Sequence, residues 1–102
     1  MAQAEAKLSR NIMNALRLKG YFCFKVHGSE YMMAGLPDVI VCANGLFIGL
    51  ETKLPGQRNN TSPRQDYVHE LIMAAQGEAR VVCSVAEAIE AVQSIIANRG
   101  KS

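Results

Sequence analysis

The chain has 102 residues, a formal net charge of +2 and 49% hydrophobic residues. These values fit one ordinary folded domain, so we expect residues 1–102 to form a single domain without a separate recognition domain. They exclude an intrinsically disordered chain, while so small a net charge does not by itself identify a nucleic-acid partner.

No stretch has the roughly 20 apolar residues that a membrane helix needs. The longest one, residues 39–50, is interrupted by Asn44 and Gly45. The N-terminal run is polar and lacks the apolar core of a signal peptide. We therefore expect no membrane association and a cytoplasmic location, which for a virus-encoded protein is the cytoplasm of the host cell.

The first half of the chain indicates one helix followed by three strands. Leu8, Ile12 and Leu16 recur at spacings of four, which predicts an amphipathic helix over residues 2–19. Aromatic and β-favouring residues predict a strand over residues 21–26, and a loop follows over residues 27–35. Two further strands are expected over residues 37–43 and 46–53. Only Asn44-Gly45 separates them, which is a strong signal for a type I′ hairpin.

The second half indicates a helix, a strand and a final helix. After a loop over residues 54–64, Ser62 and Pro63 can begin a helix that Gly77 ends. Its predicted buried stripe comprises Val68, Leu71, Ile72 and Ala75. A strand over residues 79–85 and a helix over residues 86–98 complete the order αβββαβα. Since a hairpin pairs antiparallel and a helical crossover suits parallel pairing, we predict an α/β domain with a mixed four-stranded sheet flanked by helices.

The three cysteines do not predict a disulfide framework or a zinc site. Their number is odd, and none has the spacing of a metal-binding motif. We expect reduced thiols in strand interiors at Cys23, Cys42 and Cys83.

Counting outward from the Asn44-Gly45 turn places Asp38 directly opposite Glu51, on the same face of the sheet. Strand alternation puts Lys53 on that face too. Two opposed carboxylates repel each other unless a cation lies between them. Oxygen ligands of this kind suit Mg²⁺ or Mn²⁺.

The alternative is a solvated sheet face on which Lys53 forms an ordinary salt bridge. The neighbours expected on that face, Ile40, Cys42 and Phe47, are apolar, which favours the metal site. Two more polar residues lie on inward helix faces, Glu5 in the first helix and Gln65 in the second. Glu5 can equally be explained by the preference of helix starts for acids, and Gln65 by partial exposure in a first turn.

The succession Gly35-Leu36-Pro37-Asp38, followed by Glu51-Thr52-Lys53 at the end of the next strand, resembles the PD-(D/E)XK nuclease superfamily. The run HGSEYMMAGLPD and the later S-P-R-Q segment resemble its VRR-NUC branch of virus-type replication and repair nucleases. The resemblance covers roughly residues 5–85 and implies a restriction-endonuclease-like core.

The resemblance also implies roles for the residues that match. Asp38, Glu51, the Thr52 carbonyl and Glu5 would be metal ligands, Lys53 would activate water and stabilise charge on the phosphate, and Gln65 would support the site. It further implies a metal-dependent DNA endonuclease active in DNA repair.

The predicted loops and their surroundings carry residues able to hold a DNA backbone without reading its sequence: Lys25, His27, Tyr31, Arg58 and Arg64. His69 has no such surroundings in the sequence and is interpreted as a packing or surface residue. Because no base-reading module is present, we predict selectivity for DNA structure, such as Holliday junctions or flaps.

A homodimer is expected, since two symmetric sites could cut two strands. Two alternatives remain: a non-catalytic DNA-binding accessory protein with a nuclease fold, and a sequence-specific restriction-type endonuclease.

Overall fold

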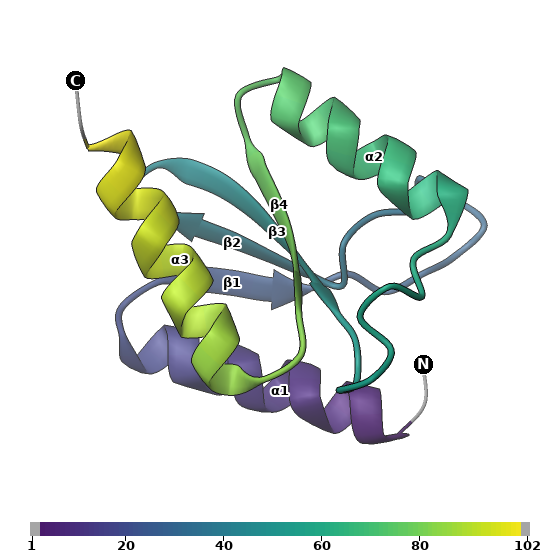
Figure 1. Ribbon diagram of the computed structural model, residues 1–102, viewed down its shortest axis with the longest axis horizontal. Helices are drawn as coiled ribbons and strands as arrows, with labels where there is room; N and C mark the ends of the chain where they lie inside the picture. Colours follow the sequence, from purple (N-terminus) through teal and green to yellow (C-terminus); the bar gives the residue numbers. More distant parts are fainter. Residues whose placement is uncertain (1–2, 101–102) are drawn as a thin grey trace.

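The chain folds in the predicted order αβββαβα, shown in Figure 1 for residues 3–100, which the computed structural model describes. The elements are α1 (Gln3–Leu18), β1 (Phe22–Lys25), β2 (Val39–Ala43), β3 (Leu46–Thr52), α2 (Pro63–Ala74), β4 (Glu78–Val82) and α3 (Val85–Arg99). The expected helix start at residue 2 lies outside the described residues. No helix within residues 3–100 is long and apolar enough to cross a membrane.

The four strands form one mixed sheet in the order β1-β2-β3-β4. The β1–β2 and β2–β3 pairs are antiparallel, whereas β3 and β4 run parallel, joined through α2. The predicted α/β class with a mixed sheet is therefore confirmed.

The hairpin between β2 and β3 has the predicted turn and register. Asn44 and Gly45 both have positive φ angles, 52° and 77°, as a type I′ turn requires. Ala43 pairs with Leu46 next to the turn, and Val39 pairs with Leu50 at the far end. The next step beyond this ladder places Asp38 opposite Glu51.

The main hydrophobic core lies between the sheet and the two helices α1 and α3, which pack against each other on one face (Figure 1). Its fully buried side chains include Ile12 and Leu16 from α1, Val41 and Ile48 from the hairpin, and Val92 from α3. Helix α2 covers the opposite face near β4. The result is three layers, with the carboxylate-bearing face of the hairpin turned toward α2.

The predicted end of β4 was wrong, whereas α3 begins within one residue of its predicted start. The last strand ends at Val82 instead of residue 85, because Ser84 caps α3. The Ser84 hydroxyl accepts a hydrogen bond from the Glu87 backbone N–H, and the Glu87 side chain accepts one from the Cys83 N–H. Capping thus takes these residues out of the strand.

The predicted buried face of α2 was also partly wrong. Val68 is buried as expected, but Leu71 and Ala75 are exposed and Ile72 is only partly buried. His69, interpreted from the sequence as either a packing or a surface residue, is 8% exposed and therefore packs inside. Helix α2 therefore turns a histidine toward the sheet.

The sheet face that carries Asp38 is less apolar and less covered than expected. Ile40 is buried, but Cys42 is exposed and Phe47 is 48% exposed, while α2 contacts the sheet chiefly at β4. Of the three cysteines expected in strand interiors, Cys23 lies buried in β1, and Cys42 lies in β2 but is exposed. Cys83 is buried just after β4.

Candidate functional site

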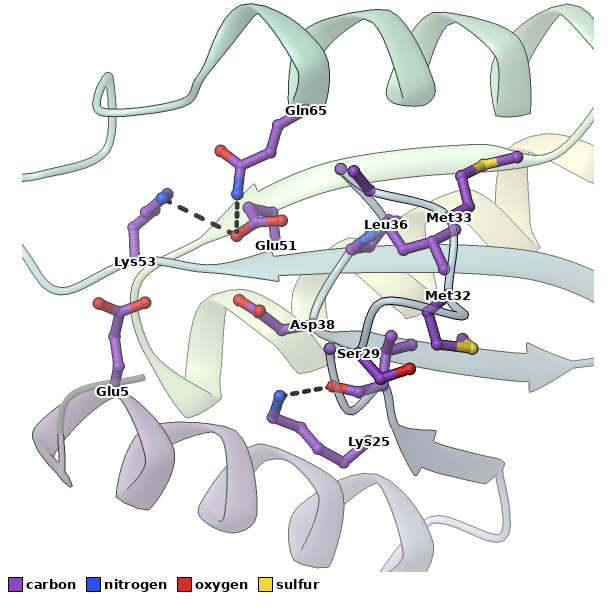
Figure 2. A pocket seen from close by; sticks show the side chains of 15 residues that line it. Glu5, Lys25, Ser29, Met32, Met33, Leu36, Asp38, Glu51, Lys53 and Gln65 are labelled. Atoms are coloured by element: carbon purple, nitrogen blue, oxygen red, sulfur yellow. Dashed lines mark hydrogen bonds and ion pairs between the residues drawn. The ribbon is translucent and has the colours of Figure 1, made fainter.

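A pocket of about 500 Å³ opens at the end of the hairpin that carries the acidic pair (Figure 2). Five predicted site side chains from four different places in the chain line it: Glu5 from α1, Asp38 just before β2, Glu51 and Lys53 at the end of β3, and Gln65 from the first turn of α2. The loop between β1 and β2 forms the rest of the wall. The fold therefore brings together residues that are up to sixty positions apart in the sequence.

Asp38 is held at the start of β2 by its own backbone and side chain. Its carbonyl accepts a hydrogen bond from the Val26 N–H at 2.8 Å, and its Oδ2 accepts one from the Thr52 N–H at 2.9 Å. A strand residue directs its N–H and C=O to the same edge, so the Thr52 carbonyl also faces the Asp38 side. The Asp38 side chain lines the pocket beside Glu51.

A close packing contact fixes the segment that leads into Asp38. Pro37 is fully buried against Gly49, where an added Cβ would come within 2.5 Å of the proline Cγ. Only glycine allows this approach. The Pro-Asp turn is therefore seated directly on the sheet.

Glu51 is the most unusual side chain of the pocket because it is only 1% exposed. Its Oε2 accepts a hydrogen bond from Gln65 Nε2 at 3.2 Å and lies 3.8 Å from Lys53 Nζ (Figure 2). Its Oε1 has no hydrogen-bond partner within the described residues. Burial first, and then the neighbouring Asp38, raise the pKa of Glu51 from 4.5 to about 8. Lys53 opposes this rise only in part.

Gln65 has two functions in one side chain. Its Oε1 accepts a hydrogen bond from the Ser62 N–H, and the Ser62 hydroxyl accepts one from the Gln65 N–H, so the two form a capping box at the start of α2. The remaining amide group donates to Glu51. The helix cap and the carboxylate are thus connected through one residue.

His69 is a contact of the site that sequence reasoning missed. Its Nε2 lies 3.9 Å from Glu51 Oε1, and burial lowers the pKa of the imidazole below 6.5. His69 follows Gln65 by four residues, so both lie on the same face of α2. That spacing is the signal that could have found it.

The pocket offers oxygen atoms suited to a hard divalent cation. Glu5 points from α1 toward the side of the pocket where Asp38 and Lys53 lie (Figure 2). Within residues 3–100, however, no three His, Cys, Asp or Glu side chains stand close enough to form a ready-made metal cluster. The close acids are Asp38 and Glu51, and Mg²⁺ commonly uses only one or two carboxylates while keeping several waters. The unpartnered buried oxygen of Glu51 fits such an ion.

The five predicted DNA-binding residues do not all lie near the pocket. Lys25 lines it, and His27 and Tyr31 are exposed in the adjoining loop. Arg64 packs against Gly35 of the same loop. Arg58 lies elsewhere: its guanidinium donates to the Val81 carbonyl and pairs with Glu87 of α3.

Comparison with known proteins shows a likeness to a solved structure. No protein-family model matches the chain, and no curated protein matches it either. A solved structure described as a VRR_NUC domain superposes with a TM-score of 0.68 and 22% sequence identity, covering 90% of this chain and 97% of that one. At this identity the likeness concerns the fold. The chain therefore has the α/β fold of a VRR_NUC domain, in agreement with the resemblance that its hairpin motifs predict.

Proposed function

We propose that this chain is a metal-dependent DNA endonuclease of the VRR-NUC branch, which hydrolyses phosphodiester bonds in branched DNA such as Holliday junctions or flaps. The observation that carries the proposal is the Glu51 carboxylate. It is buried beside Asp38 in the pocket that Lys53 also lines, and one of its oxygens has no hydrogen-bond partner among residues 3–100. A protein gains nothing in stability from such a pair without a cation, because both burial and like charge oppose ionisation of Glu51.

The ligands proposed for Mg²⁺ or Mn²⁺ are Asp38, Glu51, the Thr52 carbonyl and Glu5. When bound, the ion would polarise the phosphate and lower the pKa of a water molecule. Asp38 and Glu51 supply the negative charge that retains the ion, and Glu5 adds charge from the opposite wall of the pocket. The Thr52 N–H keeps Asp38 oriented through its 2.9 Å hydrogen bond.

Lys53 and Gln65 are proposed to complete the active site. The Lys53 side chain is 14% exposed, so its ammonium group reaches the pocket while its stem stays covered. There it would stabilise the negative charge that develops on the phosphate and orient the attacking water. Gln65 would hold the Glu51 carboxylate in place by its hydrogen bond.

Contact with the DNA backbone is proposed for the residues at the pocket and its adjoining loop, namely Lys25, His27, Tyr31 and Arg64. Such contacts position phosphates without reading bases. Arg58 is left out of this surface, because its guanidinium is already engaged by Glu87 and the Val81 carbonyl.

A homodimer is proposed because two sites are needed to cut two strands of a junction. Exposed aromatic side chains on the sheet face next to the edge strand support pairing with a second copy: Phe22 is 67% exposed, Phe24 46% and Phe47 48%. Strand pairing through Cys42 places Phe22 and Phe47 in one row across the sheet. Sedimentation at increasing concentration should show a dimer for the wild type and a monomer for Phe22→Lys; a monomeric wild type contradicts the assembly.

The nuclease activity is tested with synthetic Holliday junctions, flaps, duplexes and single strands, each incubated with Mg²⁺ or Mn²⁺ and with EDTA. We expect cutting of branched DNA that needs the ion and that Lys53→Ala reduces by at least a hundredfold. Intact substrates under all conditions, with DNA still bound, would favour the non-catalytic accessory protein. One fixed cut sequence on plasmid DNA would favour the restriction-type enzyme.

A further inference from the structure

Two polar atoms without partners face each other behind the proposed active site. Glu51 Oε1 and His69 Nε2 are both buried and lie 3.9 Å apart, and neither has a hydrogen-bond partner within residues 3–100. Buried polar groups nearly always find partners in folded proteins. The separation of 3.9 Å is too long for a hydrogen bond, but a small shift of either side chain would join the two atoms.

The position of His69 on α2 directs its side chain toward the same carboxylate that Gln65 contacts. Gln65 and His69 are one helical turn apart, and they approach the two different oxygens of the same carboxylate. The capping box with Ser62 fixes the Gln65 side chain, and the His69 side chain is only 10% exposed. Helix α2 therefore presents two prospective donors to one carboxylate, Gln65 from the wall of the pocket and His69 from the next turn of the helix.

An ionised carboxylate can accept both bonds and still bind a cation. Each of its oxygens carries two lone pairs, so a donor on each leaves a lone pair on each. A neutral imidazole carries one N–H, which must be on Nε2 to reach Glu51. Hydrogen bonds to a charged acceptor are shorter and stronger than those to a neutral one, which favours a bond across the 3.9 Å gap to a carboxylate that holds a cation.

We infer that His69 is a positioning residue for Glu51: its Nε2–H donates to Oε1 when the carboxylate binds a divalent cation, while Gln65 donates to Oε2. This inference rests on the proposed function of the pocket. In this role His69 contacts neither the ion nor the DNA. It orients Glu51, which binds the ion, and stabilises the charged form of its carboxylate. Partners of this kind, acting through a ligand, commonly change metal affinity by 10- to 100-fold.

The experiment compares His69→Leu, which removes the donor, with His69→Gln, whose amide nitrogen reaches a similar distance. Mn²⁺ binding is titrated calorimetrically on each full-length variant, and kcat and KM are measured on the branched substrate. We expect His69→Leu to raise the Mn²⁺ dissociation constant by about tenfold or more and to lower kcat without raising KM for DNA. His69→Gln should restore Mn²⁺ affinity to within about threefold of the wild type.

Two controls separate this role from packing. Glu70→Gln changes an exposed acid on the same helix and should leave Mn²⁺ affinity and kcat unchanged. Thermal unfolding in EDTA reports whether each variant is folded, and His69→Met serves as a second donor-free replacement if the leucine variant unfolds.

The outcomes distinguish the inference from the proposed function. If donor-free variants that are folded bind Mn²⁺ as tightly as the wild type, His69 is a packing residue and the inference fails, while the nuclease proposal stands. If the wild type itself binds no Mn²⁺, both the proposed function and the inference about His69 are wrong.

Discussion

Replacing Glu51 with glutamine should stabilise the metal-free protein at alkaline pH, although it removes a proposed metal ligand. Burial and the neighbouring Asp38 raise the pKa of Glu51 to about 8, from 4.5 in an unfolded chain. The folded protein therefore binds a proton that the unfolded chain has already released between these two values, and stability falls as pH rises through this window. The glutamine side chain is neutral in both the folded and the unfolded state, so the Glu51→Gln variant does not lose this stability as pH rises.

The size of this loss in the free energy of unfolding follows from the two pKa values of Glu51. At about 1.36 kcal/mol for each tenfold change, the full window corresponds to a loss of about 5 kcal/mol, which is an upper value. About 2 kcal/mol of it falls between roughly pH 6.5 and 8.5. Below pH 6.5 the lowered pKa of His69 acts in the opposite direction, and the raised pKa of Cys23 matters only above 9.0. The interval from pH 6.5 to 8.5 therefore isolates Glu51.

The assay is urea unfolding in EDTA at both pH values for the wild type, Glu51→Gln and the exposed control Glu70→Gln. The wild type and the control should lose about 2 kcal/mol across the interval, and Glu51→Gln should lose much less. Added Mn²⁺ should return stability to the wild type at pH 8.5 but not to Glu51→Gln. Equal pH dependence of the wild type and Glu51→Gln would refute the assignment of the buried charge to Glu51.

Three further substitutions test the supports of the site, each by urea unfolding beside the cleavage assay. Gly49→Ala should cost about 1–3 kcal/mol and lower activity, because the added Cβ would lie 2.5 Å from the Cγ of Pro37; an active, fully stable variant would mean that the contact relaxes freely. Gly45→Val should cost about 1–3 kcal/mol, since a β-branched residue resists the φ angle of 77°, and an unchanged midpoint would argue against the type I′ turn. Ser62→Ala should cost about 1 kcal/mol and also lower activity by loosening Gln65, whereas a loss of stability alone would separate the cap from the site.

The sequence predicted those parts of the site that depend on local geometry. The Asn44-Gly45 turn allows one register, and that register alone sets Asp38 opposite Glu51. The position of Lys53 on the same face of the sheet follows from strand alternation. For the same reason the element order and the mixed sheet could be predicted, since a two-residue turn and a helical crossover each constrain strand direction.

The parts that were missed depend on where α2 lies on the sheet. The periodicity of apolar residues shows which residues share a face of a helix or strand. It does not show which other element packs on that face or how much of the face that element covers. The exposure of Phe47 and Cys42 and the burial of His69 both follow from the placement of α2 near β4. Arg58 is a similar case, because its ion pair joins two segments 29 residues apart.

The chain connectivity around the acidic pair also has a kinetic consequence. Asp38 and Glu51 meet within one short hairpin, which can close in microseconds, whereas β4 pairs with β3 only after the intervening helix has crossed over. We expect Glu51 to stay hydrated while only the hairpin has formed, because α2 and β4 pack beside it in a later step. We therefore expect alkaline pH to accelerate unfolding in stopped-flow experiments while leaving the refolding rate nearly unchanged. A bound divalent cation would then slow unfolding and so lengthen the lifetime of the folded state. Removing the cation would speed unfolding, and hence degradation of the protein, without preventing it from folding.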